Sequence, residues 1–421
     1  MSDEGPAPRK PKNIALTTIA IPEFKSFIFG RLCLVMALRM TATTVGWIIW
    51  KVTRSLVAVG LVGLSEVIPA LLLALYAGHV IDKSEKKGLT VKALLFYMAC
   101  ALCFMVISSS YVLHHMGGHF VALAIYTVIF GTGILRAFAN PAMNAMISQI
   151  VPRELLANAV NWSQTTFLGA SVLGHATAGF LIAYFSYPVI FGVIAVLILM
   201  GLFFVLRLKP KPSSFNPAAP TRTWASVMEG LHFVYKTKEV LAAMSLDMFA
   251  VFFGGAAAMI PVYATDILRI SPIAYGWLNA ATDIGSGITI TTLTFLPLRK
   301  KQGKTLLLAV FGFGLCIITF GFSRIFLLSF FALLISGMLD GISVLVRGTI
   351  IQLKTPEEMK GRVLSVGSMF VNSSNEFGQF ESGVVAKLMG VVTSVVFGGC
   401  MTLLVVGTTW FKAPQLRKME Y

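Results

Sequence analysis

The sequence predicts an all-α polytopic membrane protein with twelve transmembrane helices in two pseudo-symmetric halves of six. Three observations lead to this prediction. Of the 421 residues, 56% are hydrophobic and only 12% are charged, about half the charged share of an ordinary soluble protein. The apolar residues form runs long enough to cross a bilayer, which takes about 20 residues. A proline-rich, charged segment divides these runs six and six.

Each apolar run is expected to be a helix, because a helix satisfies its own backbone hydrogen bonds in lipid. Twelve such helices require roughly 240 residues, which leaves the remainder for short loops and tails. The expected spans are residues 28–50, 55–78, 91–112, 120–142, 160–182, 187–206, 240–261, 275–297, 305–323, 326–347, 363–385 and 391–411.

The spans and the segments between them define the expected domain organisation. It comprises a cytoplasmic N-terminal tail (1–27), an N-terminal six-helix half (28–206), a cytoplasmic central linker (207–239), a C-terminal six-helix half (240–411) and a cytoplasmic C-terminal tail (412–421). The linker begins with a proline-rich stretch and continues into an amphipathic helical pattern.

The basic residues are distributed unevenly between alternate loops. With the N-terminus inside, 25 of the 34 Lys and Arg residues fall in inner segments and five fall in outer loops. This asymmetry predicts that both termini are cytoplasmic and that the membrane is a bacterial inner membrane. The net charge of +16 is thereby explained by topology, whereas a nucleic-acid-binding protein would gather its basic residues on a soluble face.

An internal repeat relates the two halves. Four positions in and after the fourth expected span correspond to positions 204 residues later, in and after the tenth: Gly133, Pro152 and Glu154 reappear as Gly337, Pro356 and Glu358, and Arg136 corresponds to Asp340. Parallel repeats related by an axis along the membrane normal are typical of alternating-access transporters.

Several motifs resemble the major facilitator superfamily. The hairpin GHVIDKSEKK, residues 78–87, is similar to the superfamily's G-x-L-x-D-R-x-G-R-R/K loop through Gly78, Asp82, Lys86 and Lys87. The segments SLDMFAVFFGGAAAMIPVYATDIL and LKTPEEMKGRVLSVGSMFVNSSNEFGQFESG resemble the enterobactin-exporter and macrolide-efflux branch. The resemblance covers nearly the whole chain and implies the major facilitator fold.

Ionisable residues inside the spans are candidate functional residues, because a charge at the bilayer centre costs about 2.5–3.5 kcal/mol on insertion scales. A low-dielectric cavity favours the neutral form of a carboxylate, so such a group can exchange a proton near neutral pH. The alternatives are a carboxylate permanently paired with Arg39 or Arg136, and a packed histidine without a proton path. The proton-coupling candidates are Glu66, Asp247, Asp283, Arg136 and His175. Arg136 also resembles the superfamily's fourth-span arginine, which implies proton coupling or binding of an anionic substrate.

Two further groups of residues complete the expected sites. Arg39 of the first span is a substrate-cavity candidate, together with residues that share one face of the eleventh span at about 100° per residue: Asn372, Asn375, Glu376 and Gln379. The resemblance implies a cytoplasmic gate that includes Gly78, Asp82, Lys86, Lys87, Asp340, Arg347 and Arg362. The alternatives are topological anchoring by the lysines and a structural network around Asp340 and Arg347.

These observations predict a secondary active transporter that exports an amphipathic small molecule, such as a drug or a siderophore, by proton-coupled alternating access. A lipid or lysophospholipid translocator and a non-transporting membrane receptor or scaffold remain alternatives. An enzyme is not expected, because no nucleophile–base pair or metal-ligand spacing occurs. We expect no cofactor or metal. The expected partners are the substrate, protons and membrane lipids, without nucleic acid, and the chain is expected to be a monomer.

Overall fold

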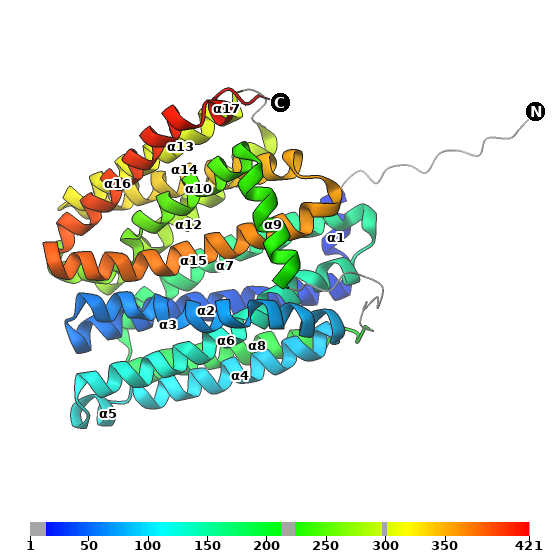
Figure 1. The fold of residues 1–421 in the computed structure, drawn as a ribbon. Helices are drawn as coiled ribbons and strands as arrows, with labels where there is room; N and C mark the ends of the chain where they lie inside the picture. Colours follow the sequence, from blue (N-terminus) through cyan, green and yellow to red (C-terminus); the bar gives the residue numbers. More distant parts are fainter. Residues whose placement is uncertain (1–13, 212–223, 297–300, 421) are drawn as a thin grey trace, which may run out of the picture.

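The computed structural model describes residues 14–211, 224–296 and 301–420. Within these residues the regular secondary structure is entirely helical, which confirms the predicted all-α class. The long helices lie side by side in one bundle (Figure 1), with the N-terminal half in blue to green and the C-terminal half in lighter green to red.

Within the described residues, each half contributes six long helices. Those of the N-terminal half are α2 (Pro22–Thr53), α3 (Leu56–Lys83), α4 (Lys86–Ile107), α6 (Gly118–Ile150), α7 (Leu156–Tyr184) and α8 (Tyr187–Leu206). Those of the C-terminal half are α10 (Lys238–Phe253), α12 (Pro272–Phe295), α13 (Gln302–Phe322), α14 (Phe326–Lys354), α15 (Glu357–Met389) and α16 (Val391–Lys412). Short helices connect or flank them: α1 (Ile14–Ile19), α5 (Ser110–His115), α9 (Trp224–Lys236), α11 (Ile260–Val262) and α17 (Pro414–Arg417).

Nine helices in the described part of the chain are long and apolar enough to cross a membrane. The other three long helices, α10, α12 and α15, are shorter or more polar and lie in the same bundle. The chain is therefore a multi-pass membrane protein, and the architecture is consistent with the twelve predicted spans.

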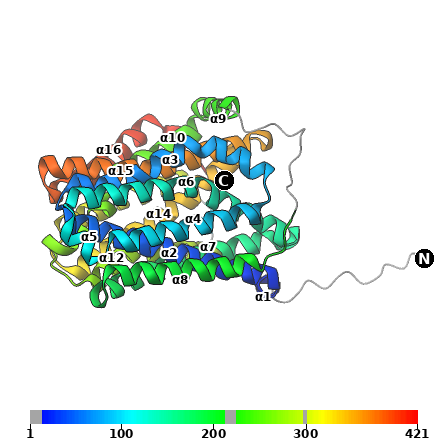
Figure 2. The ribbon, with the colours of Figure 1, turned by 90° about the horizontal axis from the view of Figure 1, so that it is seen from below.

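The bundle has two ends, which Figures 1 and 2 show on the right and on the left. We call the right-hand end the linker end: it holds α1, α9 and the turn between α3 and α4. We call the other end the far end: it holds α5, the turn between α2 and α3 and the turn between α15 and α16. The predicted topology makes the linker end cytoplasmic.

The internal repeat is visible in the helix packing. A Cβ at Gly133 of α6 would lie 2.2 Å from the carbonyl oxygen of Glu66 in α3, and one at Gly337 of α14 would lie 2.1 Å from that of Thr282 in α12. Only glycine permits such backbone contact, so the same helix crossing is built twice. The bounds of α7 and α8, moved by 204 residues, coincide with those of α15 and α16 to within three residues.

The expected span 240–261 is not one continuous helix. α10 ends at Phe253 because the two glycines that follow pack tightly: a Cβ at Gly254 would lie 2.6 Å from the ring of Phe313, and one at Gly255 would lie 2.6 Å from the carbonyl oxygen of Gly378. The chain continues to the far end through a 3₁₀ turn at Ala256–Met259, α11 and a π-helical turn at Tyr263–Ile267. In transporters, interrupted helices of this kind commonly line the substrate or ion site.

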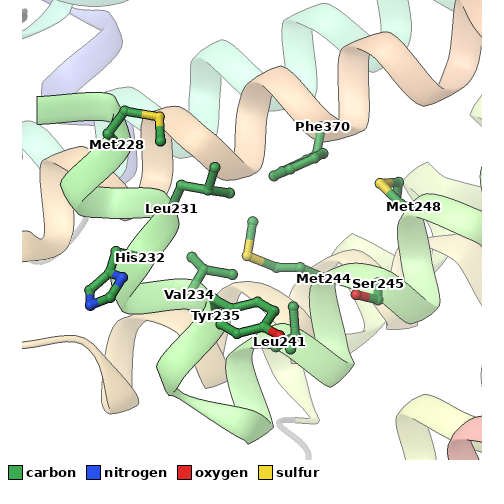
Figure 3. A pocket seen from close by; sticks show the side chains of 10 residues that line it. All are labelled: Met228, Leu231, His232, Val234, Tyr235, Leu241, Met244, Ser245, Met248 and Phe370. Carbon is green, nitrogen blue, oxygen red and sulfur yellow. The ribbon is translucent and has the colours of Figure 1, made fainter. Parts of the chain in front are cut away.

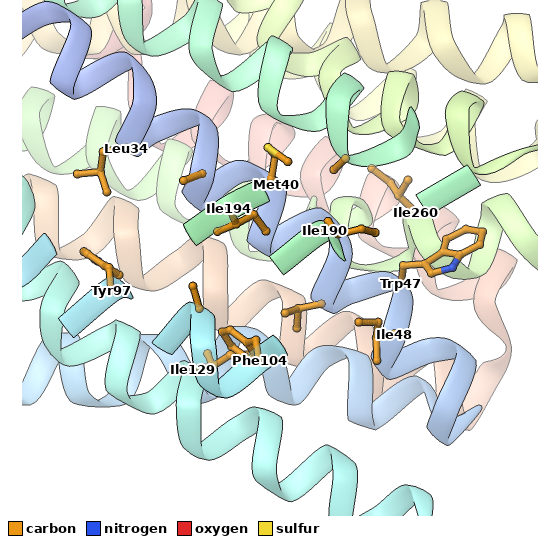
Figure 4. Close-up of a cluster of buried hydrophobic side chains, with 14 of the residues drawn as sticks. Leu34, Met40, Trp47, Ile48, Tyr97, Phe104, Ile129, Ile190, Ile194 and Ile260 are labelled. Atoms are coloured by element: carbon orange, nitrogen blue, oxygen red, sulfur yellow. The ribbon is translucent and has the colours of Figure 1, made fainter. Parts of the chain in front are cut away.

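Apolar packing holds the N-terminal half together. Buried side chains from α2, α4, α6 and α8 interlock (Figure 4), among them Met40, Ile129 and Ile194. Phe104 of α4 stacks on Phe191 of α8 with ring centroids 5.2 Å apart. This packing fixes the positions of α2 and α6, and charged side chains at the end of α2 and on α6 contact the other half.

Candidate functional site

An ion cluster joins the two halves near the middle of the bundle. The guanidinium of Arg136 in α6 donates to Glu66 of α3 at 3.0 Å and to Glu376 of α15 at 2.5 Å. We call these three residues the central cluster. The side chains of Arg136 and Glu66 are 28% and 33% exposed, whereas that of Glu376 is 8% exposed. One cation therefore bridges a partly accessible carboxylate of its own half and a buried carboxylate of the other half.

Glycines bring the three helices of the central cluster together. Gly133, one turn before Arg136, lies against the backbone of Glu66. Gly63, one turn before Glu66, lies against α15: a Cβ there would be 3.1 Å from the carbonyl oxygen of Glu376 and 2.9 Å from the side-chain oxygen of Gln379. α3 thus contacts α6 on one side and α15 on the other. These contacts place Glu66, Arg136 and Glu376 at the same height along the bundle.

A second polar cluster joins the halves between α2, α7 and α12. Nδ1 of His175 lies 2.6 Å from Oγ1 of Thr43, and Nε2 of His175 lies 3.5 Å from Oδ2 of Asp283. The hydroxyl of Ser171 donates to the same Asp283 oxygen. We call these four residues the histidine cluster. Asp283 belongs to the C-terminal half, and its three neighbours belong to the N-terminal half.

The hydrogen-bond directions in the histidine cluster define a place for a proton. The hydroxyl of Thr43 donates to the carbonyl oxygen of Arg39 at 3.0 Å, so it accepts from Nδ1 of His175. In the neutral ring this leaves the lone pair of Nε2 facing the Asp283 carboxylate. Two acceptors then face each other, and one additional proton shared between Nε2 and Oδ2 completes the network.

Further contacts fasten the halves together at the far end. The hydroxyl of Tyr275 in α12 donates to the carbonyl oxygen of Thr43 at 2.9 Å. Trp50 donates from Nε1 to Oγ1 of Thr265 at 2.7 Å, and Arg54 pairs with Asp266 at 3.1 Å. A Cβ at Gly276 would lie 2.8 Å from Cα of Gly179, so α7 and α12 also meet backbone to backbone. The far end is closed in this structure.

Asp247 lies away from both clusters. It forms an ion pair with Arg347 inside the C-terminal half, and it accepts a hydrogen bond from Ser343 at 3.4 Å. Asp247 and Arg347 are 3% and 7% exposed. The structure thus gives Arg347 a different partner from its expected neighbour Asp340, and it ties α10 to α14 rather than to the N-terminal half.

Two of the substrate-cavity candidates, Glu376 and Gln379, lie at or beside the central cluster. Arg39 stacks over the ring of Phe167 at 5.3 Å, one turn from Thr43. Asn375 is exposed and donates to the carbonyl oxygen of Val371 at 3.1 Å. Gln379 lies against α3 at Gly63. Glu376, expected in the cavity, belongs to the central cluster, and the side chain of Asn372 lies outside the described residues.

Most of the expected gate residues lie at or toward the linker end, but Asp340 lies near the middle of α14 (Phe326–Lys354), at the repeat position of Arg136. Gly78 is buried near the end of α3, and Lys86 is buried at the start of α4 with Lys87 beside it. The side chain of Asp82 lies outside the described residues. Arg362 pairs with Glu229 of α9 at 2.5 Å, and its expected contact with Asp82 stays a prediction.

Three residues of the site were not predicted from the sequence: Thr43, Ser171 and Glu229. Thr43 and Ser171 are hydroxyl residues of ordinary transmembrane helices, so no sequence signal separates them from others. Glu229 lies in the amphipathic linker segment. The sequence does not distinguish it from the other charged residues there. Within the described ranges, no group of three or more His, Cys, Asp and Glu side chains is arranged to hold a metal ion.

Comparison with known families agrees with this architecture. Residues 18–421 match the transmembrane secretion effector family of the major facilitator superfamily. The chain belongs to this family. It is 25% identical over 389 residues to the enterobactin exporter EntS of Shigella boydii serotype 4, covering 92% of this chain and 90% of that protein. It is also 25% identical over 387 residues to EntS of Escherichia coli O1:K1, with the same coverage.

Solved structures share the fold. The D-xylose-proton symporter superposes with a TM-score of 0.70 at 13% identity, covering 97% of this chain and all (100%) of that chain. A bacterial homologue of the human lysosomal transporter Spinster, solved in an inward-facing conformation, gives a TM-score of 0.69 at 12% identity and covers 97% and 98% of the two chains. This chain of the secretion effector family is therefore a membrane transporter and not an enzyme, as predicted.

Proposed function

We propose that this transporter exports an amphipathic small molecule, of the drug or siderophore class, from the cytoplasm of a bacterium by proton-coupled alternating access. The observation that carries the proposal is the bridge from Arg136 to Glu376, because it makes an inter-half contact depend on the charge of a carboxylate. The exporter relatives at 25% identity support the direction of transport and the amphipathic substrate class.

The central cluster can convert proton binding into helix movement. With both carboxylates ionised, one guanidinium holds α3, α6 and α15 together. A proton on Glu376 removes its negative charge, and Arg136 then keeps its ion pair with the ionised Glu66 of its own half. The bond between the halves weakens by the loss of a charge-assisted hydrogen bond. Proton binding therefore favours separation of α15 from α6.

The far-end contacts define one of the two states that alternating access requires. With Tyr275, Trp50 and Arg54 engaged across the halves, a bound molecule could leave only toward the linker end. Opening the far end requires these contacts to break while contacts at the linker end form. A proton on the central cluster lowers the cost of that exchange, and substrate binds the complementary protonation state.

The experiment is gradient-driven transport in proteoliposomes of defined orientation. A panel of a cationic dye, a macrolide and a catecholate siderophore is tested with an imposed pH gradient and without one. We expect the gradient to accelerate movement of at least one compound in wild type. Glu376→Gln should abolish the acceleration and remove the pH dependence of equilibrium binding of that compound.

Glu381→Gln is the matched control, because Glu381 lies on the same helix outside the central cluster and accepts a hydrogen bond from Ser382 of its own helix at 3.5 Å. It should retain the acceleration. Transport by wild type that ignores the pH gradient would remove proton coupling from the proposal. Transfer of a fluorescent phospholipid between leaflets, without transport of any panel compound, would favour the lipid translocator instead.

A further inference from the structure

A cavity lies between α9 and the C-terminal half, and none of its lining residues belongs to the central or the histidine cluster (Figure 3). Its volume is about 350 Å³. We call it the linker pocket. Its lining side chains come from α9, α10 and α15: Met228, Leu231, His232, Val234, Tyr235, Leu241, Met244, Ser245, Met248 and Phe370.

The lining chemistry suits a flexible apolar chain. Met228, Met244 and Met248 supply unbranched, polarisable side chains that adapt to irregular shapes. Phe370 closes one side of the space, as Figure 3 shows. The volume lies at the lower end of the range for ligand sites, about 300–1,000 Å³. No carboxylate lines the pocket, so a cationic ligand finds no counter-charge inside it.

The rim of the linker pocket is basic and lies where a membrane surface is expected. Lys236 and Lys238 flank the turn between α9 and α10, next to Tyr235, and both are exposed. Neither takes part in an ion pair among the described residues. On α9, Trp224 is 65% exposed and Tyr235 is 74% exposed. Aromatic and basic residues on an amphipathic helix are typical of the interface between headgroups and acyl chains.

We propose that the linker pocket binds one acyl chain of an anionic phospholipid from the leaflet at the linker end, with its phosphate held by Lys236 and Lys238. The apolar interior and the basic rim together match the two parts of such a lipid. Basic sites between helices on the cytoplasmic side are a known way for membrane proteins to hold anionic headgroups.

The bound lipid would fix α9 to α15. Glu229 of α9 already pairs with Arg362 of α15 at 2.5 Å, and a Cβ at Gly230 would lie 3.1 Å from the backbone of Arg362. Val234 packs with Val363 in the same apolar group. Since α15 also carries Glu376, the lipid stabilises the helix on which the inter-half contact is built. The proposal does not depend on the transported substrate or on proton coupling.

The test is lipid binding to the full-length protein in detergent, measured by native mass spectrometry with palmitoyl-oleoyl phosphatidylglycerol and, in parallel, with the phosphatidylcholine of the same chains. We expect one saturable phosphatidylglycerol molecule and much weaker binding of phosphatidylcholine. Each lysine near a membrane surface contributes roughly a fivefold factor in affinity for anionic lipid. Lys236→Gln with Lys238→Gln should therefore weaken phosphatidylglycerol binding about 25-fold.

The matched control is Lys412→Gln with Lys418→Gln, two exposed lysines at the linker end of the same half but away from α9; it should leave this binding unchanged. Ser245→Phe and Met244→Trp, which fill the pocket from inside, should each reduce saturable binding at least tenfold. Equal binding of the two lipids would overturn the proposal. So would unchanged binding in the filled and lysine variants, or displacement of the lipid by a transported dye.

Discussion

Replacing Glu376 by glutamine tests whether the central cluster controls the conformation. The change keeps the shape of the side chain and removes the charge that Arg136 meets at 2.5 Å. A hydrogen bond to a charged group contributes about 1.5–3 kcal/mol. Because Glu376 is only 8% exposed, little of this is lost to solvent screening. The bond joins the halves, so its loss should shift the equilibrium away from the far-end-closed state by roughly 10- to 150-fold.

Electron–electron double resonance measures this equilibrium directly. Spin labels at Met116 and Met389, which are 41% and 57% exposed, report the separation of the two halves at the far end once the five native cysteines have been replaced. Wild type near neutral pH should show mainly the shorter distance. Glu376→Gln should enrich a longer distance, and acidification of wild type should enrich the same one, because a proton also removes the charge.

Two results would refute the reasoning. One is a distance distribution in Glu376→Gln that matches wild type at every pH. The other is an equal shift in Glu381→Gln, since that control changes the same chemical group on the same helix without touching Arg136. In the expected case, acidification has a smaller effect in Glu376→Gln than in wild type.

Three further predictions concern other parts of the molecule. Asp247→Ala leaves Arg347 buried without its carboxylate, so unfolding should be easier by about 3–5 kcal/mol and the melting temperature should fall in a fluorescence melt; removing both charges should recover much of the loss, and a double variant as unstable as the single one would contradict the pairing. His175→Gln keeps a donor for Thr43 but cannot hold the extra proton, so the pH profile of gradient-driven flux should flatten; Asp283→Asn should do the same, and the double variant should be no worse, whereas additive losses would argue for independent roles. Gly276→Val places side-chain atoms into the backbone of α7, so the far-end labels should move apart while substrate binding at equilibrium is kept; an unchanged distance would show that this crossing does not hold the far end closed.

The sequence was sufficient to predict the elements and the repeat. Hydropathy located the helices, since every long apolar run must form one in lipid. The 204-residue offset between Gly133 and Gly337 anticipated the crossing that the structure shows twice. The polar face of the eleventh span also pointed to Glu376. These signals are local or periodic patterns, so they can be recognised in a single sequence.

The pairing of the charges could not be predicted in the same way. Asp247, Asp283 and Glu66 looked equivalent as isolated carboxylates in apolar spans. Their partners come from helices that are far apart in sequence, and the choice of Arg347 for Asp247 depends on which faces of α10 and α14 meet. The break after Phe253 was missed for a similar reason: it depends on contacts of Gly254 and Gly255 with Phe313 and Gly378, and a paired glycine alone does not show them.

The repeat also explains why the charges pair across the halves. The two halves share a backbone arrangement, but the position of Arg136 in one is occupied by Asp340 in the other. The C-terminal half uses Arg347 for Asp247, and both Glu376 and Asp283 find their partners in the N-terminal half. Duplication therefore supplied two matching scaffolds, and the difference in charge between them placed the polar contacts at their interface. In the proposed alternating-access cycle this interface opens and closes, so a proton that binds there acts on the movement itself rather than on the stability of either half.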